Sequence, residues 1–332
     1  MRPGRAFLIW TLALLASLVL ALCAGHVWNS PAEVFEAIFG QGRHTANLIS
    51  LWRLPRVISA ALIGVLLGMS STIFQGIFRN PLAEPWLIGS SGGAAVGATL
   101  ALLLPWSLPL EAVLPLFAFI GAIGAALLVL SLARVSGSLD TSTFLLAGIA
   151  VSAILTAVRS FLMMTLSNES ISLQVVMSWL MGAVQAPEGG AMAGLIVLTV
   201  LIFLAGEKMA RPLDLLGLGE NVAQAYGVEL RKVLIRGLLL GSAAAALAVA
   251  IGGLVAFVGL AAPHIGRYFV GTRHRLLLPA SALIGAVMVS IADALSRSLL
   301  PPGEVPLGLI TAVCGGPFFL VILSRRARQS WN

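Results

Sequence analysis

Residues 57–78 read VISAALIGVLLGMSSTIFQGIF, an apolar run without a single charged side chain. A helix of roughly 20 such residues crosses the hydrocarbon core of a membrane, and similar runs recur along the chain. The approximate spans are 6–26, 57–78, 86–105, 112–133, 142–166, 190–206, 233–251, 254–270, 276–296 and 306–324. We therefore predict an all-α polytopic transmembrane bundle of about ten helices, formed by residues 1–332 as a single domain.

The composition favours a membrane protein and excludes most other classes. Of the 332 residues, 59% are hydrophobic and 10% are charged, whereas soluble domains carry about 25% charged residues. Disordered, collagen-like and disulfide-rich proteins are excluded as well. The net charge of +7 fits basic cytoplasmic loops better than a nucleic-acid partner, because the aromatic platforms that bind single strands are missing.

Neither the histidines nor the cysteines are spaced to hold a metal ion. The two cysteines stand far apart in apolar runs, and no histidine lies three or four residues from another. We therefore predict no metal site in this chain.

The distribution of charge indicates how the helices are oriented. Arg2 and Arg5 precede the first apolar run, which lacks an A-x-A cleavage site and is long enough to be a retained first helix. With this end inside, the alternate loops on the same side hold most of the basic residues, as expected for cytoplasmic loops. The predicted outside loops hold Arg43, Arg53, Arg56 and Arg297. Both termini are therefore predicted to be cytoplasmic.

Two further patterns concern packing and docking. Glycines at a four-residue spacing predict close helix contacts, and they occur as Gly64/Gly68, Gly93/Gly97 and Gly237/Gly241. The largest polar insertion, residues 206–232, has room for one or two short helices on the cytoplasmic face. A structured loop on a chain with few loops is expected to dock a partner.

Several kinds of chemistry are missing from the sequence. The only lysines, Lys208 and Lys232, belong to no GxxxxGK[ST] loop, so the chain has no P-loop for ATP. Ionisable residues within the predicted spans are few, chiefly Arg159 and Asp293. This scarcity argues against an ion-coupled secondary transporter, which usually carries a relay of buried acids or histidines. An intramembrane enzyme is disfavoured because no acid–base pair is visible.

Several motifs, in order along the chain, point to one family. They are RLPR (53–56), QGIFRNPLAEP (75–85), LAG (146–148), LGLGE (216–220), YGV (226–228), FVGLAAPHIGR (257–267), EVPLG (304–308) and GGPFF (315–319). Together they resemble the membrane permease subunit of type II bacterial ABC importers for iron–siderophore, haem or cobalamin. RNPLAEP and GLxxPHxxR are the most specific of these motifs.

This resemblance implies a multi-pass permease of the bacterial inner membrane that works as a homodimer. Two separate ABC ATPase subunits would bind ATP and Mg, so the chain itself needs no cofactor and is not an enzyme. A periplasmic substrate-binding protein would deliver a metal chelate, either iron–siderophore or haem, for transport from periplasm to cytoplasm. Cobalamin import by the same family is the alternative, and an ion-coupled secondary transporter is a weaker one.

The resemblance also assigns roles to residues at matching positions. Docking of the binding protein falls on Arg53, Arg56 and Arg297, for which snorkelling to lipid headgroups is the simpler alternative. Coupling to the ATPase falls on Leu216, Leu218, Gly219, Glu220, Ala223 and Gly227, which could instead form a solvated connector. A cytoplasmic gate falls on Asn80, Leu82, Thr141 and Ser142. The alternative is ordinary capping, because Asp140, Thr141 and Ser142 are good N-cap types and Pro81 would end a helix.

Charged residues within the spans allow two further predictions. Arg159 is interpreted as part of the translocation path, where it would attract an anionic chelate, with pairing to an acid or snorkelling as alternatives. Asp293 and Arg297 have the i, i+4 spacing of an intrahelical ion pair. His264 is predicted to be structural rather than a metal ligand, since no second ligand lies near it in the sequence.

Overall fold

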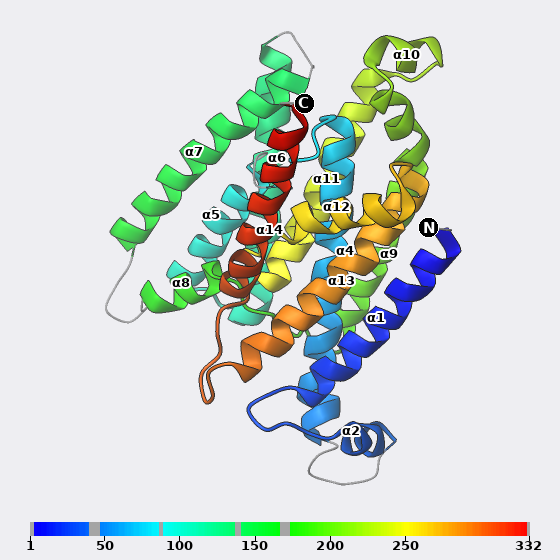
Figure 1. Ribbon diagram of the computed structural model, residues 1–332. Coiled ribbons are helices and arrows are strands. Elements are labelled where there is room, and N and C mark those ends of the chain that lie inside the picture. Colours follow the sequence, from blue (N-terminus) through cyan, green and yellow to red (C-terminus); the bar gives the residue numbers. More distant parts are fainter. Residues whose placement is uncertain (1–2, 40–46, 86–88, 137–140, 167–172, 331–332) are drawn as a thin grey trace.

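The computed structural model describes residues 3–39, 47–85, 89–136, 141–166 and 173–330, and every regular element in these ranges is a helix (Figure 1). The longer helices are α1 (Pro3–Cys23), α4 (Leu54–Ile77), α5 (Ser90–Leu103), α6 (Leu110–Val135), α7 (Thr141–Leu166), α9 (Gly189–Gly217), α11 (Leu230–Gly252), α12 (Val258–Val270), α13 (His274–Ser298) and α14 (Leu307–Ser330). The shorter elements are α2 (Pro31–Ile38), the π-helical turn η1 (Leu48–Arg53), α8 (Leu173–Leu180) and α10 (Glu220–Ala225).

Each apolar span predicted from the sequence contains one of the longer helices. In the described ranges, seven helical stretches are long and apolar enough to cross a membrane, namely α1, η1 with α4, α6, α7, α9, α11 and α13. By contrast, α5 and α12 have only 14 and 13 residues. At 1.5 Å per residue each is about 20 Å long, which is shorter than the roughly 30 Å hydrocarbon core. The all-helical membrane class is confirmed, whereas ten crossings stay a prediction.

Helix α4 is the centre of the bundle. It packs against α9, α11, α12 and α13, and every residue from Leu66 to Ile77 is buried. At Gly64 and Gly68 its backbone lies so close to α13 that an added Cβ would collide with the carbonyls of Gly285 and Ser281. The predicted glycine pair of α5 approaches the backbone of α6 in the same way. The prediction of close packing through small residues is therefore confirmed.

The structure differs from the sequence prediction in the polar insertion 206–232. Helix α9 does not end near residue 206 but continues through Pro212 to Gly217, so the connector spans only residues 218–229. The reason is that this stretch keeps a buried side at helical spacing despite its charges. The buried positions are Gly206, Met209, Ala210, Leu213 and Leu216.

A second difference lies before α12. The predicted span 254–270 becomes helical only at Val258. Gly253 and Phe257 have positive φ angles of 63° and 64°, a conformation that no right-handed helix contains. For a phenylalanine this conformation is strained, and Phe257 packs against the backbone of Gly315 in α14.

Loops gather at two ends of the bundle, which we name after the short helices that lie there (Figure 1). The α10 end holds residues 78–85, 218–229 and 271–273, and the α2 end holds residues 24–39 and 299–306. Helix α1 runs from the side of α10 to α2, and α14 finishes on the side of α10 (Figure 1). The two termini therefore lie on the same side of the bundle.

The two ends also differ in exposed charge. The α10 end and the adjoining helix turns expose basic side chains at Arg79, Lys208, Arg211, Arg231, Lys232, Arg236, Arg273 and Arg275. At the opposite end, Arg53 and Arg297 are buried inside the protein. These two arginines therefore add little to the exposed charge of the α2 end, and the charge asymmetry is sharper than loop counting from the sequence suggested.

Candidate functional site

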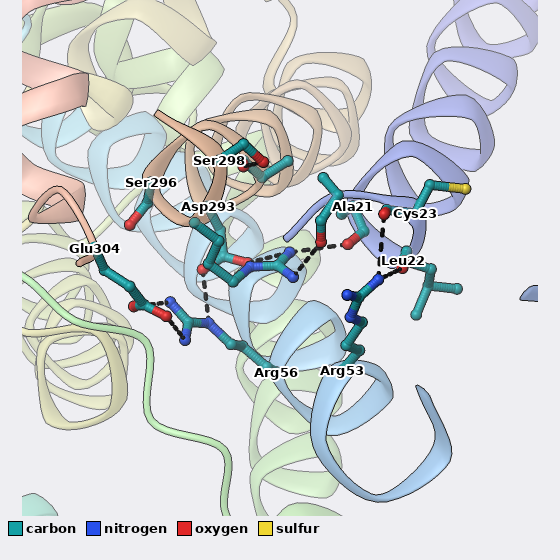
Figure 2. Close-up of polar contacts among 12 residues, drawn as sticks. Ala21, Leu22, Cys23, Arg53, Arg56, Asp293, Ser296, Ser298 and Glu304 are labelled. Carbon is teal, nitrogen blue, oxygen red and sulfur yellow. Dashed lines mark hydrogen bonds and ion pairs between the residues drawn. The ribbon is translucent and has the colours of Figure 1, made fainter. Parts of the chain in front are cut away.

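A cluster of charged side chains at the α2 end ties α1 to the rest of the bundle (Figure 2). Arg53, the last residue of η1, donates hydrogen bonds from one guanidinium nitrogen to the carbonyls of Leu22 (2.8 Å) and Cys23 (3.2 Å). Its other terminal nitrogen donates to the carbonyl of Val27 (2.8 Å). The last carbonyls of a helix lack hydrogen-bond donors within that helix. Arg53 supplies donors to two of these carbonyls in α1.

Arg297, in the last turn of α13, donates to two other backbone carbonyls at the end of α1. Its terminal nitrogens donate to Ala24 (2.8 Å) and Ala21 (2.9 Å), and its Nε donates to Asp293 (3.0 Å). Asp293 lies one turn earlier and is fully buried. A buried charge is costly unless it is paired, and the predicted i, i+4 pair is confirmed.

Arg56 completes the cluster by bridging two acids. Its Nε donates to Asp293 (2.9 Å), and its two terminal nitrogens donate to the two carboxylate oxygens of Glu304 (2.9 and 2.7 Å). Burial raises the pKa of Glu304, but the hydrogen bonds and charge of Arg56 outweigh it and hold the pKa below its usual value. Glu304 is therefore ionised at neutral pH.

The three arginines predicted to dock a binding protein thus lie together at one end of the bundle. The side chains of Arg53 and Arg297 are only 8% and 5% exposed, and both hold α1, so their structural role is clear. The side chain of Arg56 is 21% exposed and is the one that reaches the surface. Docking stays a prediction, and the geometry favours Arg56 for it.

At the opposite end, the predicted coupling residues form the short helix α10 and its flanks. Leu216 in the last turn of α9 and Ala223 in α10 are both buried, and the two helices contact each other, whereas Leu218 is 67% exposed. Gly219 and Gly227, on either side of α10, have positive φ angles of 118° and 79°, which glycine adopts without strain. The helix is thus set off from α9 and α11 by two glycine turns.

Leu218 belongs to an apolar strip that the sequence prediction did not single out. Val222 and Tyr226 follow it at four-residue spacing and are 38% and 68% exposed. Val222 and Tyr226 lie four residues apart on one side of α10 and its last turn, whereas Leu218 precedes the turn at Gly219 and caps α9. The spacing of Val222 and Tyr226 was therefore the sequence signal for part of this strip.

An ion pair links α10 to the loop that follows α4. The guanidinium of Arg79 lies 2.5 Å from the carboxylate of Glu220, the first residue of α10. In the same loop the side chain of Asn80 accepts a hydrogen bond from the backbone N–H of Leu82 (2.9 Å) and thereby forms a local turn. The pairing of Arg79 with Glu220 was not predicted, since 141 residues separate the two.

The other predicted gate residues begin α7. Thr141 is its first residue, and the placement of its side chain lies outside what the structure describes. Ser142 is exposed. The gating role stays a prediction for all four residues.

Glu84, in the same loop, connects it to α12. Its carboxylate accepts a hydrogen bond from the backbone N–H of Leu260 in the first turn of α12. Burial raises the pKa of Glu84 to about 7, although the hydrogen bond from Leu260 opposes this change. The fold therefore favours the neutral carboxyl. The contribution of Glu84 to the free energy of unfolding is fully present below its usual pKa of 4.5, and it is lost as pH rises through about 7. Sequence reasoning quoted this glutamate within a motif but did not single it out.

Arg159 lies on the least buried of the seven candidate membrane helices, α7. The side chain is partly exposed, and among the described residues its Nε has no hydrogen-bond partner. Thr156 and Ser160 beside it are exposed, and their hydroxyls bond only to carbonyls of their own helix. Polar groups facing lipid are disfavoured, so this side of α7 suits a water-filled path or a second protein surface.

Among the described residues no group of three or more His, Cys, Asp or Glu side chains is gathered to hold a metal ion. Cys23 and Cys314 are both free. His264 packs edge-on against Phe318 of α14.

Comparison with known proteins gives one consistent answer. Residues 13–325 match the FecCD transport family. The chain is 39% identical to the hemin transport system permease of Yersinia pestis, with 83% of each chain covered. It is 35% identical to the iron(III)-citrate import permease of Bacillus subtilis, covering 99% of this chain and 97% of that one. It is 36% identical to the vitamin B12 import permease of Salmonella paratyphi A, covering 98% and 97%.

A solved structure described as the inward-facing conformation of a metal-chelate type ABC transporter has the same fold. It superposes with a TM-score of 0.83 at 29% sequence identity, covering 97% of this chain and 99% of the other. Together with the apolar helices, these matches make the chain a multi-pass protein of the inner membrane. It belongs to the FecCD transport family, the membrane permeases of type II bacterial ABC importers for metal chelates, haem and vitamin B12.

Proposed function

We propose that this chain, as one permease domain spanning residues 1–332, moves an iron chelate, either haem or an iron–siderophore, from the periplasm to the cytoplasm. The observation that carries the proposal is the match of residues 13–325 to the FecCD family, with hemin and iron-citrate permeases among the relatives. The α10 end is assigned to the cytoplasm together with both termini. The concentration of exposed basic residues at that end supports this orientation.

Two separate ATPase subunits would drive transport by binding ATP and Mg. The chain has no P-loop of its own. The exposed apolar side chains of Leu218, Val222 and Tyr226, on α10 and its two flanks, support docking of such a subunit, because an exposed apolar face commonly marks a protein contact. Glu220 would transmit motion of α10 to the loop after α4 through Arg79. A Leu218→Asp variant, which places a negative charge at this exposed apolar position, is expected to lose ATPase binding, while Gln224→Asp at an exposed polar position of α10 keeps it.

Two copies of the chain would form the translocation path between them. The exposed polar side of α7 supports this arrangement, since Arg159, Thr156 and Ser160 would then face water or the second copy rather than lipid. Asn80 and Leu82 with Thr141 and Ser142 would form the cytoplasmic gate. State-dependent crosslinking of cysteines placed at Leu82 or Ser142 tests the gate, and a pattern independent of nucleotide would argue against it.

The substrate-binding protein would dock at the α2 end. An arginine presents a planar fork that matches a carboxylate in a bidentate manner. Arg56 is the partly exposed arginine of the cluster, so we assign the contact with an acidic side chain of the binding protein to it. Arg53 and Arg297 would support docking indirectly by fixing the end of α1.

The substrate is tested by uptake. The transporter is reconstituted with its ATPase and binding protein in proteoliposomes, and ATP-driven uptake of haem, ferric citrate and cobalamin is compared. We expect an iron chelate to be preferred, and preferential uptake of cobalamin would establish the alternative.

Arg159→Ala is expected to reduce uptake of an anionic chelate about tenfold, as for loss of one charge-assisted contact, whereas Arg159→Lys retains most of it. Unchanged uptake by the alanine variant would remove Arg159 from the path.

A further inference from the structure

All three nitrogens of the Arg56 guanidinium donate a hydrogen bond to an acid of the chain itself. Its Nε is bonded to the buried Asp293, and both terminal nitrogens are bonded to Glu304 in a bidentate pair. A bidentate carboxylate is also the arrangement that an acidic side chain of a docking partner would require. The place assigned to the partner is therefore filled by a residue of the chain itself (Figure 2).

The two acids around Arg56 are held very differently. Asp293 is fully buried, belongs to the rigid helix α13 and is shared with Arg297. Glu304 is 41% exposed and lies in the loop between α13 and α14. Water can therefore solvate the Glu304 carboxylate when it separates from Arg56, whereas a separated Asp293 would be left as an unpaired buried charge. Of the two acids, Glu304 is the one that can leave.

We propose that Glu304 is a displaceable placeholder, and that Arg56 exchanges it for an acidic side chain of the binding protein when that protein docks. This inference rests on the docking role proposed for Arg56. Asp293 keeps the guanidinium oriented throughout the exchange by holding Nε, so the outward fork stays aimed at the surface. Glu304 also keeps Arg56 neutralised in the undocked transporter, which lowers its attraction for other anions.

The exchange predicts an increase in affinity when the placeholder is removed, which simple loss of a structural contact does not. The full transporter in nanodiscs is immobilised, and binding of its purified binding protein is measured by surface plasmon resonance at low ionic strength. We expect Glu304→Gln to tighten binding about three- to tenfold, which is less than the coupling of close charge pairs at interfaces, because the substitution removes a competitor and adds no new contact. Glu188→Gln removes the same charge from an exposed residue that makes no capping bond at the start of α9, and it should alter affinity less than twofold.

Two further variants separate the exchange from docking itself. Arg56→Gln should weaken binding, and in that background Glu304→Gln should no longer tighten it, since the competition acts through Arg56. Glu304→Asp keeps the charge but shortens the side chain, so its affinity should lie between wild type and Glu304→Gln. This variant also provides the test if Glu304→Gln does not fold.

The possible outcomes are distinct. If Arg56→Gln weakens binding but Glu304→Gln leaves it unchanged or weakens it, docking at Arg56 stands and the placeholder is overturned. If Arg56→Gln has no effect, the docking role of Arg56 fails and the inference fails with it. Tighter binding by Glu304→Gln that persists without Arg56 would also overturn the exchange.

Discussion

Replacing Asp293 by asparagine keeps the size of the side chain but removes the charge on which two arginines depend. Asp293 is fully buried and lies 2.9 Å from both Arg56 and Arg297. With Arg53 and Glu304, the cluster holds three positive and two negative groups, so its net charge rises from +1 to +2 in the variant. Removing one partner of a buried pair costs about 3–5 kcal/mol, because the other charge is left uncompensated.

The cost should appear as a large loss of thermal stability. At about 2–4 °C per kcal/mol, Asp293→Asn is expected to lower the apparent Tm by about 6–20 °C in detergent at a fixed scan rate. The matched control is Glu188→Gln, which removes an exposed acid at the start of α9 and should change the free energy of unfolding by less than about 0.5 kcal/mol. If Asp293→Asn melts within 2 °C of the wild type, the cluster does not hold α1 as described.

Three further predictions follow from other contacts. Gly64→Ala places a methyl group against the carbonyl of Gly285 and should destabilise the bundle by about 1–3 kcal/mol; an unchanged apparent Tm would show that α4 and α13 can separate freely. Glu84→Gln keeps an acceptor without ionising, so the wild type should lose about 1 kcal/mol of stability between pH 6 and 8 while the variant does not, as measured by apparent Tm across that range. Glu220→Gln breaks the exposed pair with Arg79, whose partners are 40% and 38% exposed, and should cost no more than about 1 kcal/mol; a larger drop in apparent Tm would mean that this pair alone holds α10.

The helices could be predicted from the sequence because apolar runs of membrane length dominate it. The run at 57–78 became the central helix α4, and each predicted span contains a helix. The end of α9 could not be predicted by hydropathy, since Glu207, Lys208 and Arg211 interrupt the apolar run. The buried positions continue at helical spacing to Leu216. This spacing was the sequence signal that could have predicted the longer helix.

The start of α12 could not be predicted for a different physical reason. Residues 254–257 read LVAF and are as apolar as the helices around them. Hydropathy records the solvent a segment prefers, whereas the break at Gly253 and Phe257 comes from two positive φ angles. These angles are set by tertiary packing, including the contact of Phe257 with Gly315.

For the candidate site, the sequence indicated the residue types and the structure supplied their partners. Asp293 and Arg297 were predicted as a pair because their spacing is local. Arg56 was predicted as a docking residue, but its pairing with Glu304 spans 248 residues and follows from how α4 and α13 pack. The burial of Arg53 was missed as well, because a positive charge in a predicted loop is normally expected at the surface.

The central claim is that the chain is a conduit whose energy comes from a separate ATP-hydrolysing subunit. The direct test measures accumulation of iron chelate in proteoliposomes that contain this chain alone, or this chain with its ATPase and binding protein, with ATP present and ion gradients imposed in turn. We predict accumulation against a gradient only in the complete, ATP-supplied vesicles. Uphill accumulation by the chain alone, driven by an ion gradient, would contradict the account.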